Sequence, residues 1–270
     1  MIKNFLQILI LLRVIIVFEV RKIILVTVLT VALNSSATIA RTIESVMKQT
    51  YNNIEYIIVD GNSQDDTVKI AESYREKFNA IPGRTMKIIS EPDLGMYDAL
   101  NKGARLANGV IVGQVNSDDF YEPDAVKTMA EVYEREKFNV AWGTVRIKTG
   151  KGIIIKHAKL PKGGGGMTTT HWHHASTFSE RKILLEYPYI LEDFCDDFDF
   201  ILRCYCEGKK LSVTDKVISN FNFGGMSTQK SLSEVIRRWK AICKIYRRYG
   251  LSKLYYVQRF IYEFTKYLMA

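Results

Sequence analysis

The stretch IEYIIVDGNSQDDT, residues 54–67, decides the fold class. Its first six residues are mostly apolar and lead to Asp60, as expected for a strand that is buried on both faces of a sheet. A polar loop follows, and its residues Asp65 and Asp66 suit the amino end of a helix, which carries partial positive charge. The stretch therefore predicts a strand, a loop and a helix that extends to about Phe78.

The same unit recurs on both sides of this stretch. Strand-like segments occupy residues 23–31, 86–90 and 110–115, and helical patterns occupy residues 37–49 and 97–107. Four strands with intervening helices predict an α/β fold with a mostly parallel central sheet and flanking helices. The segments expected after Pro123 are helices ending near residues 138, 185 and 207 and strands near residues 139–143, 144–157, 211–214 and 217–223.

Composition and charge exclude several classes of protein. The 270 residues are 47% apolar and 25% charged, which is close to the globular average and argues against disorder, collagen and coiled coil. The formal net charge is +9, but residues 231–270 hold nine basic and two acidic residues, and residues 1–22 hold four and one. Because the body between them is nearly neutral, we expect the ends to contact an anionic surface and the chain to bind no nucleic acid.

The two ends carry separate predictions. Residues 1–21 form an apolar N-terminal extension that is broken by Arg13, and its apolar run is shorter than the roughly 20 residues that cross a bilayer. We expect a helix that lies on the fold or on a membrane, or an extension outside the core that arises from the choice of start site; insertion into a membrane is the alternative. Residues 231–270 predict a basic tail of two amphipathic helices around Gly250, which lies on anionic lipid or packs back on the fold.

Two further features bear on mobility and on the cellular setting. Four consecutive glycines, residues 163–166, predict a mobile loop that serves as a linker or as a lid over a substrate. The four cysteines lack the spacing of a zinc knuckle or a disulfide framework. We interpret them as reduced thiols of a cytosolic protein.

Polar side chains follow each of the first four predicted strands. Asn34 follows the first strand, Asp60 the second, Asp93 the third, and the sequence NSDD, residues 116–119, the fourth. Ligands of parallel sheets bind beyond the carboxyl ends of the strands, so these side chains mark a candidate binding edge.

The aspartates of the fourth cluster suggest a metal. Asp118 and Asp119 could hold a hard divalent cation such as Mg²⁺ or Mn²⁺, which leaves positions open for phosphate oxygens. The alternative is an ordinary Asp turn before a helix that begins at Pro123. The sequence contains neither a GxGxxG motif after the first strand nor a GxxxxGK[ST] motif, which weakens dehydrogenase and ATPase interpretations.

Several motifs together resemble one known family. In order they are TVALN (30–34), IEYIIVDGNSQDDT (54–67), SEPDLGMYDALNKG (90–103), NSDD (116–119), HASTF (174–178) and DDFDFILR (196–203). This pattern resembles the inverting family 2 glycosyltransferases, which have the GT-A fold, and it covers roughly residues 22–223. The resemblance implies a GT-A type, Rossmann-like catalytic domain over residues 22–230, with a nucleotide-binding half at about 22–122 and an acceptor half at about 123–230.

The resemblance also implies roles for individual residues. The residues that match nucleotide-sugar-binding positions are Thr30, Ala32, Asp60, Asp93, Asn101, Lys102, Asn116 and Asp118. Asp118 matches the metal-binding member of the DxD-like motif, with Asn116 in its first place and Asp119 as an added charge. The expected cofactor is therefore Mg²⁺ or Mn²⁺.

The acidic segment near residue 197 matches the catalytic part of the pattern. Asp197 matches the catalytic base, while Asp196 and Asp199 remain competitors for this role. His174 matches a histidine that relatives often follow with Gln, but Ala175 stands here, so an acceptor contact through that amide is not expected to be retained.

The other histidines admit two interpretations. His157, His171, His173 and His174 fall within eighteen residues. A zinc site would need a third ligand at a suitable spacing, which is not apparent. We favour strand histidines that line the acceptor side of the site.

The resemblance implies a specific reaction. A sugar would move from a nucleotide-sugar, with a UDP-sugar expected, to a hydroxyl of a lipid-linked saccharide during synthesis of a bacterial surface polysaccharide such as O-antigen, capsule or exopolysaccharide. Direct displacement needs a base at the hydroxyl and a cation at the diphosphate, and no covalent nucleophile. The enzyme would sit peripherally on the cytoplasmic face of the inner or plasma membrane. The alternatives are transfer to polyprenyl phosphate and a non-catalytic, nucleotide-binding membrane-associated protein.

Overall fold

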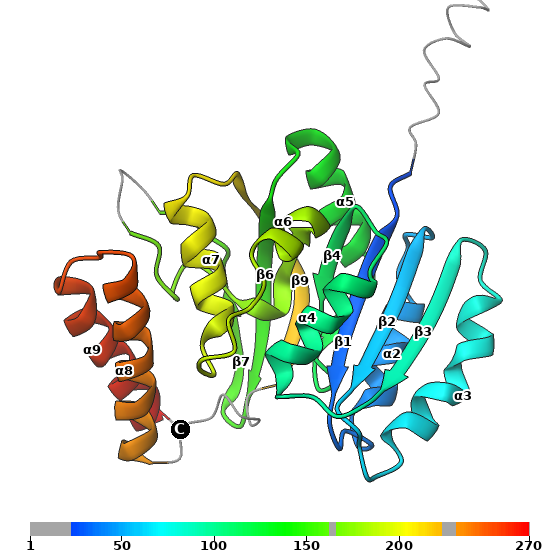
Figure 1. Ribbon diagram of the computed structural model, residues 1–270, viewed down its shortest axis with the longest axis horizontal. Coiled ribbons are helices and arrows are strands. Elements are labelled where there is room, and N and C mark those ends of the chain that lie inside the picture. The colour runs from blue at the N-terminus through cyan, green and yellow to red at the C-terminus, as the bar shows by residue number, and fades with distance from the viewer. Residues whose placement is uncertain (1–22, 162–165, 223–230, 270) are drawn as a thin grey trace, which may run out of the picture.

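The computed structural model describes residues 23–161, 166–222 and 231–269. The described residues therefore exclude the expected N-terminal extension of residues 1–21 and most of the glycine tract. The prediction that this tract forms a linker or a lid stays untested for the same reason. The described chain forms an α/β fold in which helices cover both faces of one sheet (Figure 1).

The described residues place nine strands in the sheet, in the order β3-β2-β1-β4-β8-β6-β9-β5, with β7 paired to β6. The strands are β1 (Val26–Ala32), β2 (Ile54–Asp60), β3 (Arg84–Ser90), β4 (Ile111–Gln114), β5 (Phe120–Tyr121), β6 (Val140–Thr149), β7 (Gly152–Lys156), β8 (Thr177–Glu180) and β9 (Leu211–Asn222). The first four are parallel, β8 runs antiparallel to β4 and β6, and β6 and β9 are again parallel. The predicted α/β class and its sheet are thus confirmed.

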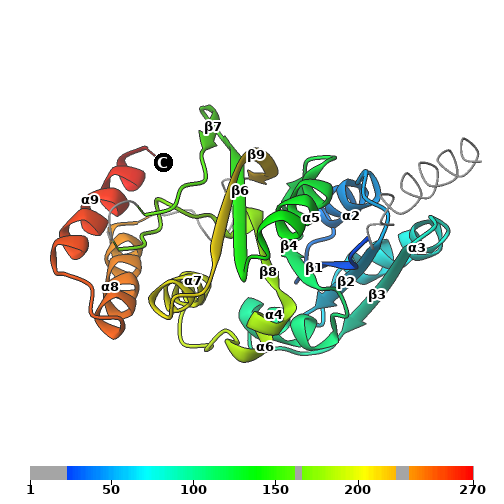
Figure 2. The same cartoon turned by 90° about the horizontal axis from the view of Figure 1, so that it is seen from above.

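The helices divide between the two faces of the sheet. They are α2 (Ile39–Met47), α3 (Thr67–Asn79), α4 (Met96–Leu106), α5 (Ala125–Glu136), α6 (Arg181–Glu186), α7 (Asp196–Cys206), α8 (Leu232–Arg248) and α9 (Leu254–Met269), with a short 3₁₀ turn η1 (His174–Ser176). In β1, Val26 and Val28 face a core shared with α2, α3 and α5, whereas Leu29 and Val31 face a core shared with α4, α6, α7 and α8 (Figure 2). Alternate side chains of a strand point to opposite faces, so both faces of β1 are apolar.

The second half of the sheet differs from the predicted strands. Residues 211–214 and 217–223 were expected as two strands, but β9 is one strand that passes through both. Gly143 pairs with Thr214 and Thr144 pairs with Val217, so Asp215 and the residue after it form a bulge opposite β6. A bulge accommodates extra residues without ending the strand. In the same way, the predicted strand of residues 144–157 is split between the end of β6 and the hairpin strand β7.

The tail forms two helices, as predicted, and α8 packs on the fold. Ser231 caps α8 by accepting a hydrogen bond from the Glu234 N–H. Ile242, Ile245 and Tyr246 of α8 belong to the main core and are buried. The apolar stripe that predicted a lipid contact therefore packs against protein in α8. No helix in the described part of the chain is long and apolar enough to cross a membrane.

Candidate active site

The carboxyl ends of β1, β2 and β3 form one row of residues. Ala32, Asp60 and Ser90 are paired in register, so Asp60 lies in the middle of the row, where it is fully buried. Its carboxylate accepts hydrogen bonds from the Ser63 N–H at 2.8 Å and from the Ser90 hydroxyl at 2.7 Å. Asp60 therefore shapes the loop that follows β2, and its contact with a nucleoside stays a prediction.

The loop after β3 approaches this row closely. A Cβ atom on Gly61 would lie 2.7 Å from Oδ2 of Asp93, so the backbone at Gly61 leaves space for that carboxylate. Asp93 also accepts a hydrogen bond from the Gly95 N–H at 2.8 Å, just before α4. Lys102 on α4 forms an ion pair with Glu91 at 3.0 Å. Asp93 and Lys102 thus lie beside the loops that would surround a nucleotide.

Two residues with predicted binding roles make contacts inside the fold. The hydroxyl of Thr30 shares a hydrogen bond with that of Tyr56 at 3.1 Å. The amide of Asn101 donates to the Tyr189 carbonyl and accepts from the Tyr189 N–H, each at 2.9 Å. These contacts satisfy buried polar groups. Both side chains therefore stabilise the fold next to the site, and their direct contact with a ligand stays a prediction.

The loop after β4 carries the candidate metal ligands. Asp118 is partly exposed, and its backbone carbonyl accepts a hydrogen bond from Nη2 of Arg41 at 2.7 Å. Asp119 is fully buried, and its Oδ1 accepts from the Asn222 N–H at 3.2 Å, whereas its Oδ2 has no hydrogen-bond partner. Burial, and then the neighbouring Asp118, raise the pKa of Asp119 well above its usual range. Asn116 is half-buried in the same loop.

This donor set fits a hard divalent cation. A cation would stabilise the ionised form of Asp119 and supply the partner that its Oδ2 lacks. Mg²⁺ and Mn²⁺ prefer such oxygen ligands, and Mg²⁺ is commonly held by one or two carboxylates together with phosphate oxygens and water. Across the described ranges, no cluster of three or more His, Cys, Asp or Glu side chains could hold a metal alone. The residues therefore suit a cation shared with a diphosphate.

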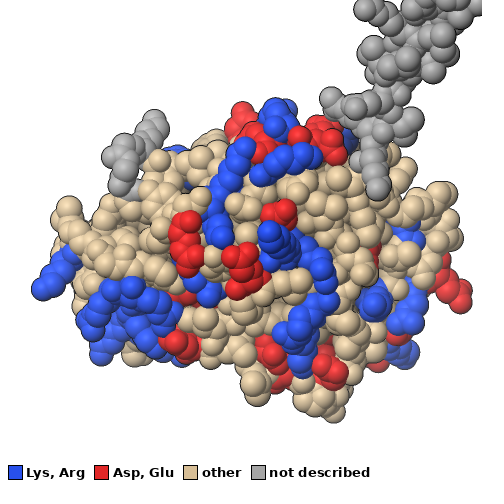
Figure 3. Space-filling view, turned by 45° about the horizontal axis from the view of Figure 1, so that its top comes forward, with Lys and Arg blue, Asp and Glu red and all other residues tan. Residues whose placement is uncertain are grey.

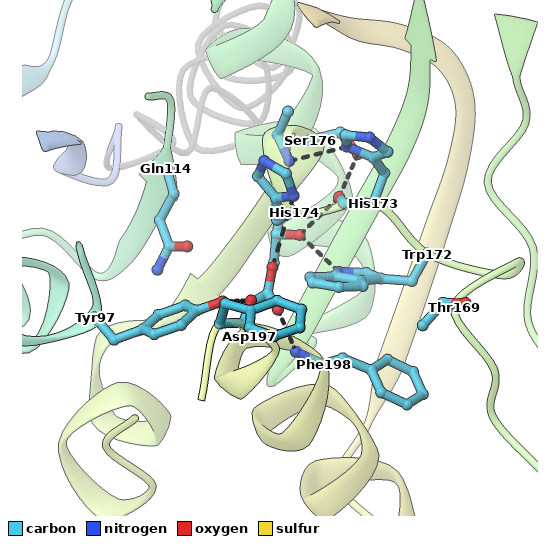
Figure 4. Close-up of polar contacts among 12 residues, drawn as sticks. Tyr97, Gln114, Thr169, Trp172, His173, His174, Ser176, Asp197 and Phe198 are labelled. Atoms are coloured by element: carbon cyan, nitrogen blue, oxygen red, sulfur yellow. Dashed lines mark hydrogen bonds and ion pairs between the residues drawn. The ribbon is translucent and has the colours of Figure 1, made fainter. Parts of the chain in front are cut away.

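Asp197 forms the second part of the site, in the first turn of α7. Its side chain is 17% exposed, and Nδ1 of His174 lies 3.6 Å from its Oδ2. The Phe198 N–H donates to its Oδ1 at 2.7 Å. Burial raises the pKa of Asp197 to about 6, against the opposing effects of the hydrogen bond from the Phe198 N–H and of the nearby Tyr97 hydroxyl. Figure 4 shows His174 and Tyr97 directed at this carboxylate, with Gln114 on the side of β4.

The structure separates the three aspartates that the sequence left as competitors. Asp196 is buried and accepts two hydrogen bonds from backbone N–H groups of the preceding loop, at 2.8 and 3.1 Å. Asp199 is buried and forms an ion pair with Arg248 of α8 at 2.6 Å. Of the three carboxylates, that of Asp197 is the most accessible to a substrate.

Two successive residues at the end of β9 connect the two parts of the site. The ring of Phe221 contacts that of His174 edge-on, with centroids 5.5 Å apart. The next residue, Asn222, donates from its side chain to the Asp118 carbonyl at 2.5 Å and from its backbone to Asp119. The loop of the candidate metal ligands and the surroundings of Asp197 are therefore neighbours.

The remaining histidines have structural contacts. Nδ1 of His171 accepts a hydrogen bond from the Thr168 N–H at 3.2 Å, and burial lowers the pKa of His171. Nδ1 of His173 accepts from the Ala175 N–H at 3.3 Å. The His173 ring stacks on that of His174, with centroids 4.7 Å apart. Nothing in these contacts supports a zinc site, and the stack helps to hold His174 beside Asp197.

The basic side of α8 lies against the acidic segment of residues 192–199. Glu192 forms ion pairs with Lys244 at 2.8 Å and with Arg248 at 2.6 Å. Two further arginines of α8 lie over the ring of Phe194, at 4.8 and 4.9 Å from its centroid. Figure 3 shows Lys and Arg side chains gathered over α8, next to acidic ones. Part of the charge that the sequence assigned to a lipid contact is thus neutralised within the chain.

We expect Arg248→Ala to lower the free energy of unfolding by about 2–3 kcal/mol. The substitution leaves Asp199 buried without its ionic partner, and the cost falls below the full 3–5 kcal/mol for a buried pair because Arg248 is partly exposed. Chemical denaturation measures the effect. Arg247→Ala, at an exposed neighbouring position, is the control and should change stability by less than about 0.5 kcal/mol. Equal denaturation midpoints for the two variants would contradict the role of this ion pair.

Comparison with known proteins identifies the family. The model of the glycosyl transferase family 2 matches residues 27–205, which is well over half of the chain. The chain is a family 2 glycosyltransferase. The expectation of a glycosyltransferase that takes its sugar from a nucleotide-sugar is thus confirmed, whereas metal dependence and inversion stay predictions.

Sequence relatives of this family 2 chain align with different fractions of its length. The PGL/p-HBAD biosynthesis glycosyltransferase of Mycobacterium tuberculosis H37Ra is 27% identical over 217 residues, which are 76% of this chain and 80% of that protein. The chondroitin synthase of Escherichia coli is 34% identical over 112 residues. That match covers 42% of this chain and only 16% of the synthase.

Solved structures confirm the GT-A fold of this family 2 enzyme. Residues 1–349 of S. aureus TarS in complex with UDP-GlcNAc superpose with a TM-score of 0.66 at 18% identity, covering 91% of this chain and 73% of that one. The mannosyltransferase PcManGT from Pyrobaculum calidifontis, in complex with GDP-Man and Mn²⁺, gives a TM-score of 0.61 at 15% identity. It covers 91% of this chain and 75% of that one. At these identities the likeness establishes the fold.

Several residues at the site of this family 2 enzyme could not be predicted from its sequence. Tyr97 lies beside Asp197. It belongs to the quoted motif SEPDLGMYDALNKG, but its position in a predicted helix did not indicate the direction of its side chain. Its hydroxyl donates to the Phe194 carbonyl at 2.8 Å. Gln114 ends β4 and exchanges hydrogen bonds with the Tyr189 hydroxyl at 2.8 and 3.1 Å. A polar residue that ends an otherwise apolar strand was the available signal for Gln114.

Proposed function

We propose that this chain is an inverting glycosyltransferase that moves a sugar from a UDP-sugar to a hydroxyl of a lipid-linked saccharide. The observation that carries the proposal is that a partly exposed carboxylate lies near a loop whose side-chain oxygens suit a metal ion. Asp197 provides the first and Asp118 the second, and the residues Phe221 and Asn222 connect them. Inverting transfer needs a base for the acceptor hydroxyl on one side of the anomeric carbon. On the other side it needs a site that stabilises the charge of the departing diphosphate.

Asp197 acts as the general base in this proposal. The acceptor hydroxyl gives its proton to the Asp197 carboxylate while its oxygen forms a bond to the anomeric carbon. The bond from that carbon to the diphosphate oxygen breaks, and the diphosphate keeps the electron pair. A base with a pKa near 6 is ionised at neutral pH and still binds a proton more strongly than an exposed aspartate does. His174 at 3.6 Å orients the carboxylate.

In this proposal Asp118 and Asp119 would hold Mg²⁺ or Mn²⁺, which would supply positive charge near the departing diphosphate. Arg41 and Asn222 fix the backbone of the loop through the Asp118 carbonyl, which keeps the two carboxylates in place. Asp60, with Asp93 beside it, shapes the pocket for the nucleoside at the edge of β2.

Two comparisons support the choice of donor. The TarS structure contains UDP-GlcNAc, and the PcManGT structure contains GDP-Man with Mn²⁺. We propose a UDP-sugar and keep GDP-mannose in the test. The acceptor would be carried at the cytoplasmic face of the membrane, where this chain would bind peripherally during synthesis of a surface polysaccharide.

The proposed function is tested by screening UDP-sugars and GDP-mannose for metal-dependent hydrolysis and for transfer to lipid-linked saccharides extracted from a bacterium. We expect one donor to be turned over in the presence of Mn²⁺ or Mg²⁺. Binding of UDP with Mn²⁺ without hydrolysis or transfer would instead favour a non-catalytic nucleotide-binding protein. Failure of every donor to bind would contradict the proposal.

The pH dependence of turnover provides a second test of Asp197. We expect log kcat to fall by about one per pH unit below pH 6 and to reach a plateau above about pH 7, because only the ionised base accepts a proton. The groups around this carboxylate are His174, Tyr97, Cys195 and Arg238. Steady-state rates at saturating donor and acceptor measure the profile. A profile that stays flat down to pH 5 would contradict a base with this pKa.

A further inference from the structure

The hairpin of β6 and β7 projects from the same edge of the sheet as the active site. β6 is antiparallel to β8, which is antiparallel to β4, so β6 runs in the same direction as β1 and β4. The carboxyl end of β6 and the turn of residues 149–152 therefore lie at the edge where β1 and β2 end. Figure 1 shows this turn at the lower side of the molecule, with the ends of β1 and β2.

The strand β7 exposes three consecutive isoleucines at this edge. Ile153, Ile154 and Ile155 are 64%, 47% and 41% exposed. Within the described ranges, β7 pairs with β6 alone, so its outer edge is open. Natural sheets usually cover or charge such an edge, and contiguous exposed apolar side chains mark contact surfaces.

Helix α9 carries a second set of exposed apolar side chains. Thr169 connects the two elements, because its carbonyl accepts a hydrogen bond from Nζ of Lys156 at 2.9 Å and its hydroxyl bonds to Arg259 of α9. Figure 2 places the hairpin and the carboxyl end of α9 at one edge of the molecule, opposite α4 and α6. The exposed apolar side chains of α9 are Leu254, Val257, Phe260, Ile261 and Phe264. We call these side chains, together with the three isoleucines of β7, the hairpin–α9 surface.

The charges around this surface are basic. Residues 144–161 contain no acidic residue, and Glu263, the acidic residue of α9, is fully buried in an ion pair with Arg259. Exposed lysines lie in the hairpin, at Lys148 and Lys151, and next to the two elements, at Lys159 and Lys253. Apolar side chains with basic neighbours and no exposed acidic ones complement an anionic bilayer, since the lysines meet headgroups while the apolar groups enter the interface.

We propose that the hairpin–α9 surface rests on a bilayer that contains anionic phospholipid. This proposal rests on the proposed function, because it places the carboxyl edge of the sheet beside the membrane that would carry a lipid-linked acceptor. It also reassigns the lipid contact within the tail. The basic side of α8 is paired with the segment of residues 192–199, whereas α9 and the hairpin present the open apolar groups.

The test uses the full chain with vesicles of phosphatidylcholine, alone or mixed with phosphatidylglycerol, in a sedimentation assay. We expect the wild-type chain to bind the mixed vesicles and not the neutral ones. The double variant Ile153→Ser/Ile155→Ser should bind about tenfold more weakly or worse, and so should Lys148→Glu/Lys151→Glu. The matched control is Val110→Ser/Leu185→Ser, whose side chains are 39% and 41% exposed away from the hairpin. It should bind as the wild type does.

Three outcomes of the vesicle assay would overturn the proposal. Absence of wild-type binding contradicts a lipid contact, and equal binding by the isoleucine variant places the contact elsewhere in the chain. A dimer that the isoleucine substitutions dissociate, without vesicle binding, would make a second copy the occupant. Nucleotide-sugar hydrolysis is measured on the same samples without vesicles. Vesicle binding without hydrolysis would contradict the proposed function and support the lipid contact of the hairpin–α9 surface. Hydrolysis without vesicle binding would support the proposed function and contradict the lipid contact.

Discussion

Asp197→Asn is expected to reduce kcat by roughly 10²–10⁴-fold, with little change in KM for the nucleotide-sugar. An amide of the same shape keeps the hydrogen bond from the Phe198 N–H but cannot take the proton of an acceptor hydroxyl. The substitution should not destabilise the fold, because burial already disfavours the charged form of Asp197. Transfer assays and thermal denaturation of the same preparation separate the two effects.

The control for this variant is Asp193→Asn. Asp193 lies four residues earlier in the same acidic segment, and its Oδ1 accepts a hydrogen bond from the Phe194 N–H that an amide oxygen can also accept. Turnover of this control should stay close to the wild-type value. Near-normal turnover of Asp197→Asn would contradict the role of the base, and it would favour polyprenyl phosphate as the acceptor, since a phosphate oxygen is already ionised.

Asp118→Ala is expected to reduce turnover about a thousandfold, and removal of divalent ions with EDTA should have a similar effect on the wild type. The reason is the charge that develops on the departing diphosphate, whose stabilisation requires a cation that this carboxylate helps to hold. Titration with Mn²⁺ should restore the wild type and leave the variant inactive. Calorimetry should show that UDP binding depends on Mn²⁺ in the wild type alone.

Asp66→Ala is the control for this second variant. Asp66 is highly exposed just before α3, and its carboxylate forms an exposed ion pair with Lys69 at 3.8 Å. It should respond to EDTA and Mn²⁺ as the wild type does. Full turnover in EDTA, or a fully active Asp118→Ala variant, would contradict the assignment of a metal to this loop.

The strands and helices of residues 22–122 could be predicted well because their signals are local. The strands ending at Ala32 and Asp60 are runs of apolar residues, and the helix of residues 67–79 begins after an acidic loop. Parallel strands of this kind must be buried on both faces, so the composition of each segment determines its place. The loop of Asp118 and Asp119 could likewise be placed at the carboxyl edge from its position after β4.

The arrangement of residues 123–230 depends on contacts between distant segments, which the sequence does not show. Asp196, Asp197 and Asp199 are equivalent by composition, and only the partners in the loop before α7 and in α8 distinguish them. The break expected between residues 214 and 217 was wrong because a bulge keeps β9 continuous. The lipid contact of the tail was expected from its total charge. The ion pairs that Arg248 forms with the acidic segment could not be anticipated from that charge.

The pairing between α8 and the acidic segment limits how this enzyme can be recombined with its relatives. Glu192 and Asp199 on one side and Lys244 and Arg248 on the other act as a matched set. A chimera that receives a foreign tail without residues 192–199 of the same donor would bring mismatched charges together beside Asp197. A chimera of such enzymes should therefore receive both segments from the same donor.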